Sequence, residues 1–178
     1  MEETIDAFRS YANIKHINLT YESSFRYLNV WLDKDKMDSI LKNIISNALK
    51  YTPDGGNVHV FTSETEDTWS IEVKDTGIGI PASEQKKLFK MHFRGSNAIN
   101  SKVTGSGIGL LLVGKLVHLH KGKLNFTSTE GKGSCIKVSF PKGEKRYRKA
   151  IHRPAPTKEQ EQNNDCLLYT SDAADDKA

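Results

Sequence analysis

The chain has 178 residues, of which 37% are hydrophobic and 27% charged, and it carries a net charge of +4. These values are typical of one soluble globular domain and exclude collagen-like and low-complexity sequences. No stretch approaches the roughly 18 apolar residues that a membrane-spanning helix requires, and the first residues lack the basic-then-apolar pattern of a signal peptide. We therefore expect a cytoplasmic segment without direct membrane contact.

The positive charge is concentrated in one window near the end of the chain. Residues 142–153 contain six basic residues and one acidic residue, so the rest of the chain is close to neutral. A domain without a basic face is poorly suited to bind phosphate backbones, and we expect no nucleic-acid partner. The two cysteines, Cys135 and Cys166, cannot form a disulfide framework, and no His/Cys spacing indicates zinc.

The first part of the chain is expected to contain a helix, a pair of strands and a longer helix. Residues 3–13 fit a helix, and alternating residues in 17–21 and 25–31 favour two paired β-strands. A second helix is predicted by apolar residues that recur three and four positions apart, at Met37, Ile40, Leu41, Ile44, Ile45, Ala48 and Leu49. Proline and glycines in residues 52–56 end this helix.

The following residues alternate hairpins with helices. The predicted elements are an antiparallel hairpin from 58–60 and 69–73, a helix over 83–91, a mobile polar loop over 97–106, a helix over 108–120, and a hairpin from 124–126 and 136–140. This order predicts an α/β fold, a two-layer sandwich whose mixed sheet has one face covered by helices and one face more open.

A change in composition near Pro141 predicts the end of the folded domain. We expect residues 1–141 to form the domain and residues 142–165 to form a basic, then polar, disordered linker. Such a linker buries too little apolar surface to offset the entropy lost on ordering. Residues 166–178 match nothing before them, look like read-through of adapter sequence, and are left out of the fold prediction.

Two asparagines, Asn43 and Asn47, lie four positions apart on the predicted helix and therefore stack on one face, bordering its apolar stripe. Lys50 and Tyr51 follow at the end of the same helix. Together these residues offer amide oxygens for a metal ion, a cation for phosphate and a ring for packing. The alternative is that both asparagines simply face solvent.

Two glycine-rich segments are candidate ligand loops. Residues 75–81 (DTGIGIP) follow a predicted strand, where the glycines would let a flat ligand approach and Asp75 could accept a hydrogen bond from an exocyclic amine such as that of adenine. The alternative is a tight turn initiated by Asp75. Residues 105–110 (GSGIGL) lead into a helix whose N-terminus would receive a phosphate. The alternative there is a glycine cluster that caps the helix.

Other nucleotide and hydrolase signatures are missing from the sequence. It contains no phosphate-binding loop of the Gly-x-x-x-x-Gly-Lys-Ser/Thr type and neither the His-Arg-Asp nor the Asp-Phe-Gly motif of protein kinases. It also lacks the Gly-x-Ser-x-Gly elbow of serine hydrolases.

In their order along the chain, the motifs resemble the ATP-binding domain of sensor histidine kinases. They correspond to that family's N, G1, F and G2 boxes and its terminal glycine element: NIISNALKY at 43–51, DTGIG at 75–79, FKMHFR at 89–94, GSGIG at 105–109 and GKGS at 131–134. The resemblance covers about residues 1–141 and is strongest to the hybrid kinases. It implies a Bergerat-type α/β sandwich with a flexible ATP lid.

The resemblance also implies a role for each matched position. Asn47 would coordinate Mg²⁺, Asn43 would contact the phosphates, and Lys50 would reach phosphate or ribose. Tyr51 would pack on adenine while Asp75 binds its amine. The other expected contacts to the base are Gly77, Gly79 and Ile80, and Ser134 through a water bridge to Asp75 and adenine. Phe93 and Arg94 would begin the lid, with Arg94 directed at the phosphates. The residues expected around the triphosphate are Gly105, Ser106, Gly107, Ile108, Gly109 and Leu110.

The family transfers the γ-phosphoryl group of ATP to a histidine on a separate dimerisation hairpin. In the family that histidine is followed by an acidic residue, and none of the six histidines here is. The chain would therefore supply ATP positioning alone, through Asn43, Asn47 and Arg94. Its implied partners are the histidine-bearing dimerisation domain and the receiver domain of a response regulator, in a kinase anchored to the membrane.

Two alternatives share the same nucleotide fold. ATP-driven clamps of the gyrase and mismatch-repair kind carry a glutamate four residues before the magnesium asparagine, to activate water. Here that position is Asn43, which is a poor general base. The second alternative is a catalytically silent nucleotide-binding module, which would bind ATP without transferring phosphate to an added dimerisation hairpin.

Overall fold

The computed structural model describes residues 1–89 and 107–143, all of which belong to one compact unit, Met1–Glu144. In chain order the elements are α1 (Glu2–Ile14), β1 (Asn18–Ser23), α2 (Lys34–Tyr51), β2 (Asn57–Glu64), β3 (Thr68–Asp75), the 3₁₀-helix η1 (Gln85–Lys87), α4 (Gly109–Leu119), β4 (Lys123–Thr129) and β5 (Gly133–Pro141). The predicted loop over 97–106, most of the predicted linker and the predicted tail lie outside the described residues.

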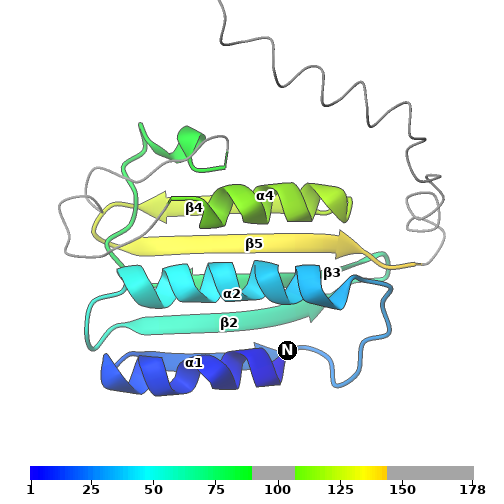
Figure 1. The fold of residues 1–178 in the computed structure, drawn as a ribbon, viewed down its shortest axis with the longest axis horizontal. Coiled ribbons are helices and arrows are strands. Elements are labelled where there is room, and N and C mark those ends of the chain that lie inside the picture. The colour runs from blue at the N-terminus through cyan, green and yellow to red at the C-terminus, as the bar shows by residue number, and fades with distance from the viewer. Residues whose placement is uncertain (90–106, 144–178) are drawn as a thin grey trace, which may run out of the picture. The chain divides into compact units, whose positions relative to one another are not determined.

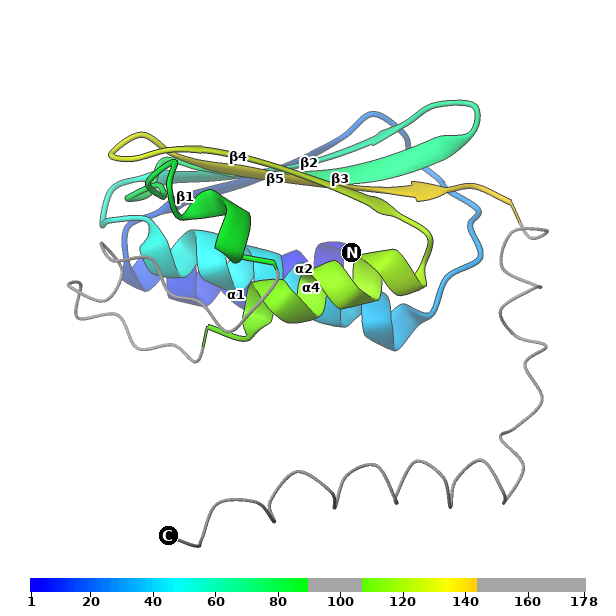
Figure 2. The same ribbon diagram turned by 90° about the horizontal axis from the view of Figure 1, so that it is seen from above.

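The five strands form one mixed sheet in the order β1-β2-β3-β5-β4 (Figure 1). β1 runs parallel to β2, and the other neighbouring strands are antiparallel. Figure 2 shows α1, α2 and α4 on one face of the sheet, and no described element covers the opposite face. The predicted two-layer α/β sandwich with a mixed sheet is confirmed.

The core lies between the sheet and α2. The apolar side chains along one face of the helix pack against the inward-facing side chains of the strands. The α2 side chains that are at most 1% exposed are Ile40, Leu41, Ile44, Ile45 and Leu49. The strand residues that face them are buried at every second position, at Val58 and Val60 in β2, Ile71 and Val73 in β3, and Ile136, Val138 and Phe140 in β5. Each such side chain contributes about 1.5–3 kcal/mol of hydrophobic stabilisation.

α2 begins where a side chain caps it. The Oδ1 atom of Asp33 accepts a hydrogen bond from the Lys36 amide at 3.1 Å, which satisfies one of the free N–H groups of the first turn. Hydrogen bonds from the Lys36 side chain and backbone lower the pKa of Asp33. None of the helices in the described ranges is long and apolar enough to cross a bilayer.

The prediction of paired strands over 17–21 and 25–31 is wrong in its second half. β1 pairs with β2, which follows α2 in the chain, and residues 24–33 form no strand. In that connection Leu28, Val30 and Leu32 pack against the core, while Tyr27 and Trp31 are 80% and 58% exposed. The alternation of apolar and polar residues in 25–31 therefore comes from an extended connection in which every second side chain packs against the core. It does not come from a strand that is hydrogen-bonded within the sheet.

The prediction of a helix over 83–91 is also wrong in its described part. Residues 83–89 form turns around the short 3₁₀-helix η1, and residues 90–91 lie outside the described range. The Gln85 side-chain amide donates hydrogen bonds to the carbonyls of Ile80 and Ser128, both at 2.9 Å. These tertiary bonds fix the segment against β4 in a conformation that local helix propensity does not predict.

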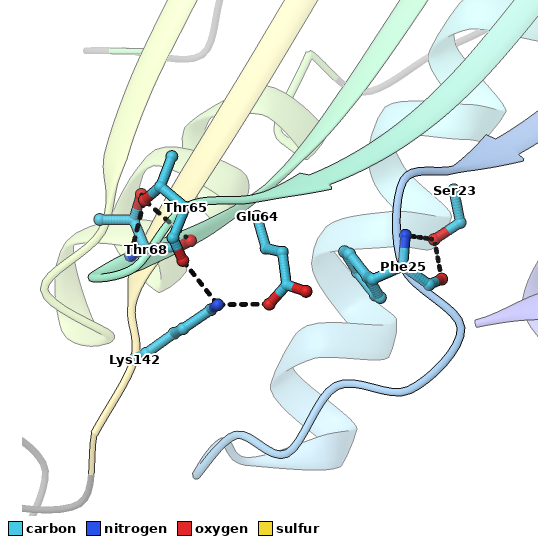
Figure 3. Close-up of polar contacts among 6 residues, drawn as sticks. All are labelled: Ser23, Phe25, Glu64, Thr65, Thr68 and Lys142. Carbon is cyan, nitrogen blue, oxygen red and sulfur yellow. Dashed lines mark hydrogen bonds and ion pairs between the residues drawn. The ribbon is translucent and has the colours of Figure 1, made fainter.

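The end of β5 is fastened to the turn between β2 and β3 (Figure 3). The Lys142 amide donates to the Asp67 carbonyl at 2.7 Å. Its ammonium donates to the Thr65 carbonyl at 2.6 Å and pairs with the Glu64 carboxylate. Because Thr68 pairs with Pro141 in the sheet, these contacts lie at the end of β3 opposite Asp75.

Candidate functional site

The paired asparagines of α2 lie next to the start of α4. The Asn43 side-chain amide donates to the Ser39 carbonyl at 2.8 Å, which leaves its Oδ1 atom for other contacts. A Cβ atom built at Gly109 would lie 2.8 Å from Asn43 Oδ1 and 3.6 Å from Asn47 Nδ2. The first residue of α4, at the helix end that carries positive partial charge, therefore adjoins both carboxamides.

Asp75 is the last residue of β3, and the described residues hydrogen-bond to only one of its two carboxylate oxygens. Its Oδ1 atom accepts hydrogen bonds from the Gly77 amide at 2.8 Å and from the Ser134 amide at 3.2 Å. Within residues 1–89 and 107–143, no donor reaches Oδ2. Burial raises the pKa of Asp75, against the opposing effect of the two amide bonds. A half-buried carboxylate with a free oxygen is an acceptor for an amine of a ligand.

The loop after Asp75 is packed between α2 and the β4–β5 turn. The Ile78 amide donates to the Tyr51 carbonyl at 3.1 Å. A Cβ atom at Gly77 would lie 2.6 Å from that same carbonyl oxygen, and one at Gly79, whose φ is +64°, would lie 2.0 Å from the Thr129 carbonyl oxygen. These glycines are therefore required by close contacts within the chain, whatever ligand the loop also meets.

Lys50 and Tyr51 complete the same corner of the domain. The Lys50 ammonium lies 5.4 Å from the centroid of the Tyr51 ring, and both side chains are half-buried. Both residues belong to the last turn of α2, whose backbone contacts the loop after Asp75. The structure thus brings the α2 and β3 motifs together, as the sequence predicts.

Ser128 is a contact of this site that sequence reasoning missed. Its hydroxyl accepts a hydrogen bond from the Ile80 amide at 2.8 Å and lies 3.0 Å from the Gly133 carbonyl oxygen and 2.9 Å from Ser134 Oγ. The hydroxyl therefore joins the loop after Asp75 to both strands of the β4–β5 hairpin. One signal existed: Ser128 shares a strand face with the apolar Leu124, so the pattern places a polar residue on the inward side.

Ser134 meets Asp75 through its backbone, since its amide is the donor and its hydroxyl bonds to Ser128. The expected water bridge from its hydroxyl stays a prediction. Phe93, Arg94, Gly105 and Ser106 lie outside the described residues.

The remaining predicted contacts lie at the start of α4. Gly107 adopts a φ of +72°, Ile108 is the 42% exposed N-cap, and Leu110 is in the first turn. No group of three or more His, Cys, Asp or Glu side chains in the described ranges could hold a metal ion. The side-chain amides of Asn43 and Asn47 lie beside the start of α4, and an amide oxygen is a donor type that Mg²⁺ accepts.

The raised pKa of Asp75 gives a testable titration. Because burial disfavours the charged carboxylate, the folded state should hold its proton to higher pH than the unfolded chain does. The contribution of Asp75 to the free energy of unfolding should therefore fall as pH rises from the ordinary aspartate pKa through the raised one. Carbon-13 NMR of the free protein should show this titration, with Asp75→Asn identifying the resonance. A midpoint at or below the ordinary aspartate value would contradict the expectation.

Comparison with known proteins bears on this site. Residues 32–144 match the family described as "Histidine kinase-, DNA gyrase B-, and HSP90-like ATPase". The chain is 40% identical over 129 residues to sensor histidine kinase WalK of Bacillus subtilis, covering 71% of this chain and 21% of the relative. It is 38% identical over 135 residues to the circadian input-output histidine kinase CikA of Thermosynechococcus vestitus, covering 76% and 18%. The chain thus spans about a fifth of the length of these relatives.

Solved structures show the same fold. The mycobacterial sensor histidine kinase MprB superposes with a TM-score of 0.67 at 26% identity, covering 80% of this chain and 95% of that one. The catalytic domain of histidine kinase ThkA gives a TM-score of 0.69 at 23% identity, covering 79% and 89%. The fold is the Bergerat-type α/β sandwich of histidine kinase catalytic domains. With more than half of its residues matched by the family model, the chain belongs to the family of histidine kinase-, DNA gyrase B- and HSP90-like ATPases.

Proposed function

We propose that this chain is the ATP-binding catalytic domain of a two-component sensor histidine kinase, and that it holds Mg-ATP for transfer of the γ-phosphoryl group to a histidine on a separate dimerisation domain. The observation that carries the proposal is the half-buried Asp75 carboxylate with its free Oδ2, in the same domain as the asparagine pair against the start of α4. The two named relatives, which are both called histidine kinases, favour this function over that of the clamp ATPases.

The residues present fit the nucleotide and its ion. The free Oδ2 of Asp75 can accept a hydrogen bond from the exocyclic amine of adenine, which distinguishes adenine from guanine because guanine carries a carbonyl there. The amide oxygens of Asn43 and Asn47 are hard ligands suited to Mg²⁺. A bound Mg²⁺ would neutralise phosphate charge. The backbone N–H groups at the start of α4, around Ile108 to Leu110, would point toward the phosphates, and the positive end of the helix dipole would favour their negative charge.

In this proposal the residues position the nucleotide and stabilise the negative charge of its phosphates. Phosphoryl transfer needs the attacking and leaving oxygens in line and the phosphate charge balanced, and little covalent chemistry from the protein. In this proposal Asp75, with Tyr51 and the loop glycines Gly77 and Gly79, fixes the base, and Asn43, Asn47 and Lys50 fix the phosphate end. Asn43 stands where clamp ATPases carry a glutamate, so water is not activated and ATP is kept for the acceptor histidine.

The remaining parts of the proposal concern the residues outside the described ranges and the partners. Phe93 and Arg94 would begin the ATP lid, and Gly105 and Ser106 would extend the phosphate loop. The nucleotide domain would end near Pro141, with a linker after it. The partners would be the dimerisation domain of the same kinase and the receiver domain of a response regulator, and this domain would act in the cytoplasm in a phosphorelay.

The proposed function is tested by binding and then by transfer. Thermal shift and calorimetric titration with ATP, ADP and GTP should show adenine-selective binding that is stronger with Mg²⁺. Adding a purified dimerisation hairpin and γ-labelled ATP should then label a histidine, giving an acid-labile and alkali-stable phosphate. Failure to bind ATP would refute the assignment, whereas binding without transfer would favour the silent module.

A pair of glycine variants in α4 separates site geometry from helix stability. Gly109→Ala places a methyl group 2.8 Å from Asn43 Oδ1, so the Asn43 side chain must move away from its present position, where it donates to the Ser39 carbonyl. We expect ATP affinity to fall about tenfold, because displaced polar contacts cost about 1–2 kcal/mol. Calorimetric titration measures the affinity.

Gly114→Ala is the matched control in the same helix. Its new Cβ would lie 3.6 Å from Phe89 Cβ, an ordinary contact, so it should raise the free energy of unfolding by about 0.5–1 kcal/mol through helix propensity. Its ATP affinity should equal that of the unmodified chain. Equal affinities for both variants would show that Asn43 does not need its present position.

A further inference from the structure

One ammonium group holds the last carbonyls of α2. The Nζ atom of Lys15, which follows α1, donates hydrogen bonds to the carbonyl oxygens of Leu49 at 2.9 Å, Lys50 at 3.5 Å and Thr52 at 2.7 Å. These carbonyls belong to the end of α2 and its C-cap, where no intrahelical donor is available. A side chain that lies 34 to 37 residues earlier in the chain therefore supplies hydrogen-bond donors to three carbonyl groups at the end of α2.

The core fixes where Lys15 stands. The residue after it, His16, has a φ of +53°, and the chain then turns so that the Ile17 amide donates to the Ala12 carbonyl at 2.8 Å. Ala12 and Ile17 are 1% and 4% exposed. The Lys15 carbonyl also accepts a bond from the Gly55 amide at 3.3 Å. Lys15 thus contacts the α2–β2 connection with both its ammonium and its backbone.

Charge makes this contact stronger than a neutral cap. The carbonyl end of a helix carries negative partial charge, and a cation there is stabilised most when it is partly buried, as Lys15 is. Hydrogen bonds from an ammonium are also stronger than those between neutral groups. Without the cation, the last turn of α2 would have to take its donors from water and could fray.

That last turn connects directly to the candidate nucleotide loop. It carries Lys50 and Tyr51, and the Tyr51 carbonyl accepts the Ile78 amide at 3.1 Å. One residue earlier in the loop, the Gly77 amide donates to Asp75 Oδ1 at 2.8 Å. A shift of the helix end would therefore be passed on, through two hydrogen bonds, to the carboxylate proposed to read the base.

We propose that Lys15 is a positioning residue for nucleotide binding: by clamping the end of α2 it holds Tyr51 and the Asp75 loop in the arrangement that binds adenine. Lys15 touches no nucleotide in this proposal, which rests on the proposed function. Removing its charge should weaken the binding of ATP even under conditions in which the domain remains fully folded.

The test uses three variants of the full chain. Lys15→Met removes the cation and keeps the aliphatic length, and Lys15→Arg restores a cation at the same place. Lys142→Met is the matched control, because Lys142 also binds a carbonyl and an acidic side chain (Figure 3) but lies at the end of β3 opposite Asp75. The affinity for ATP is measured by calorimetry at a temperature where circular dichroism shows each variant to be fully folded, and the melting temperature is recorded for each.

We expect the dissociation constant for ATP to rise about tenfold in Lys15→Met, and less than about threefold in Lys15→Arg, because the charge at the helix end is kept. Lys142→Met should lower the melting temperature and leave the dissociation constant unchanged. Unchanged affinity in Lys15→Met, or equal losses in Lys15→Met and Lys142→Met, would overturn the proposal. If the unmodified chain binds no ATP, the proposed function is refuted, and the proposal for Lys15 is refuted as well because it rests on that function.

Discussion

Replacing Asp75 with asparagine is expected to weaken ATP binding by about two orders of magnitude or more while the domain stays folded. An asparagine Oδ1 can still accept the two amide bonds from Gly77 and Ser134 that Asp75 accepts, so the loop should keep its shape. The free Oδ2, however, becomes an NH₂ group. A donor would then face the donor amine of adenine, and both the hydrogen bond and the charge would be lost.

The stability of the same variant gives an internal check. Since burial raises the pKa of Asp75, the ionised carboxylate is disfavoured in the folded state at neutral pH. The melting temperature of ligand-free Asp75→Asn should therefore equal or exceed that of the unmodified chain. Asp67→Asn, an exposed charge change in the β2–β3 turn, is the control and should leave ATP affinity unaltered. Tight ATP binding by Asp75→Asn would show that the base lies elsewhere.

Replacing Asn47 with alanine is expected to remove the magnesium dependence of ATP binding. The side chain is half-buried next to the start of α4, and no hydrogen bond to it is found among the described residues. Its removal therefore leaves no polar group of residues 1–89 and 107–143 without a partner, and stability should change by less than about 1 kcal/mol. What disappears is the amide oxygen proposed as a ligand of the ion.

The measurement compares ATP titrations with Mg²⁺ and with EDTA. In the unmodified chain Mg²⁺ should strengthen binding about tenfold or more, and in Asn47→Ala the two titrations should coincide. Ser46→Ala, one position earlier and exposed on the same helix, should keep the full magnesium effect. A magnesium effect that survives in Asn47→Ala would assign the ion to other residues.

The sequence predicted best those parts of the fold that local periodicity specifies. The α2 stripe from Met37 to Leu49 is buried as its spacing predicts, because a helix repeats every 3.6 residues whatever surrounds it. The partner of β1 was not predictable in this way. A parallel pair needs a crossover, here through α2 to β2, and the alternation in residues 25–31 carries no information on which strand lies alongside.

The contacts of the candidate site also differ in whether the sequence predicts them. Motif order predicted that Asp75 and the last glycine element meet, and Ser134 does reach Asp75 across 59 positions of sequence. Lys15 and Gln85 could not be identified, because each donates to the backbone of a distant segment, and the one signal for Ser128 was its place on the inward face of its strand. Every residue has a backbone carbonyl, so the residue types in a single sequence do not indicate which carbonyl such a side chain binds.

The Oδ2 atom of Asp75, which accepts no hydrogen bond from the described residues, would link ligand binding at the proposed nucleotide site to the stability of the domain. Burial disfavours the charged carboxylate in the ligand-free domain, and a hydrogen bond from a purine amine would offset part of this desolvation cost. Occupied and empty molecules should then differ in their resistance to heat and to proteases, by about 2.7 kcal/mol when ligand is present at a hundred times its dissociation constant.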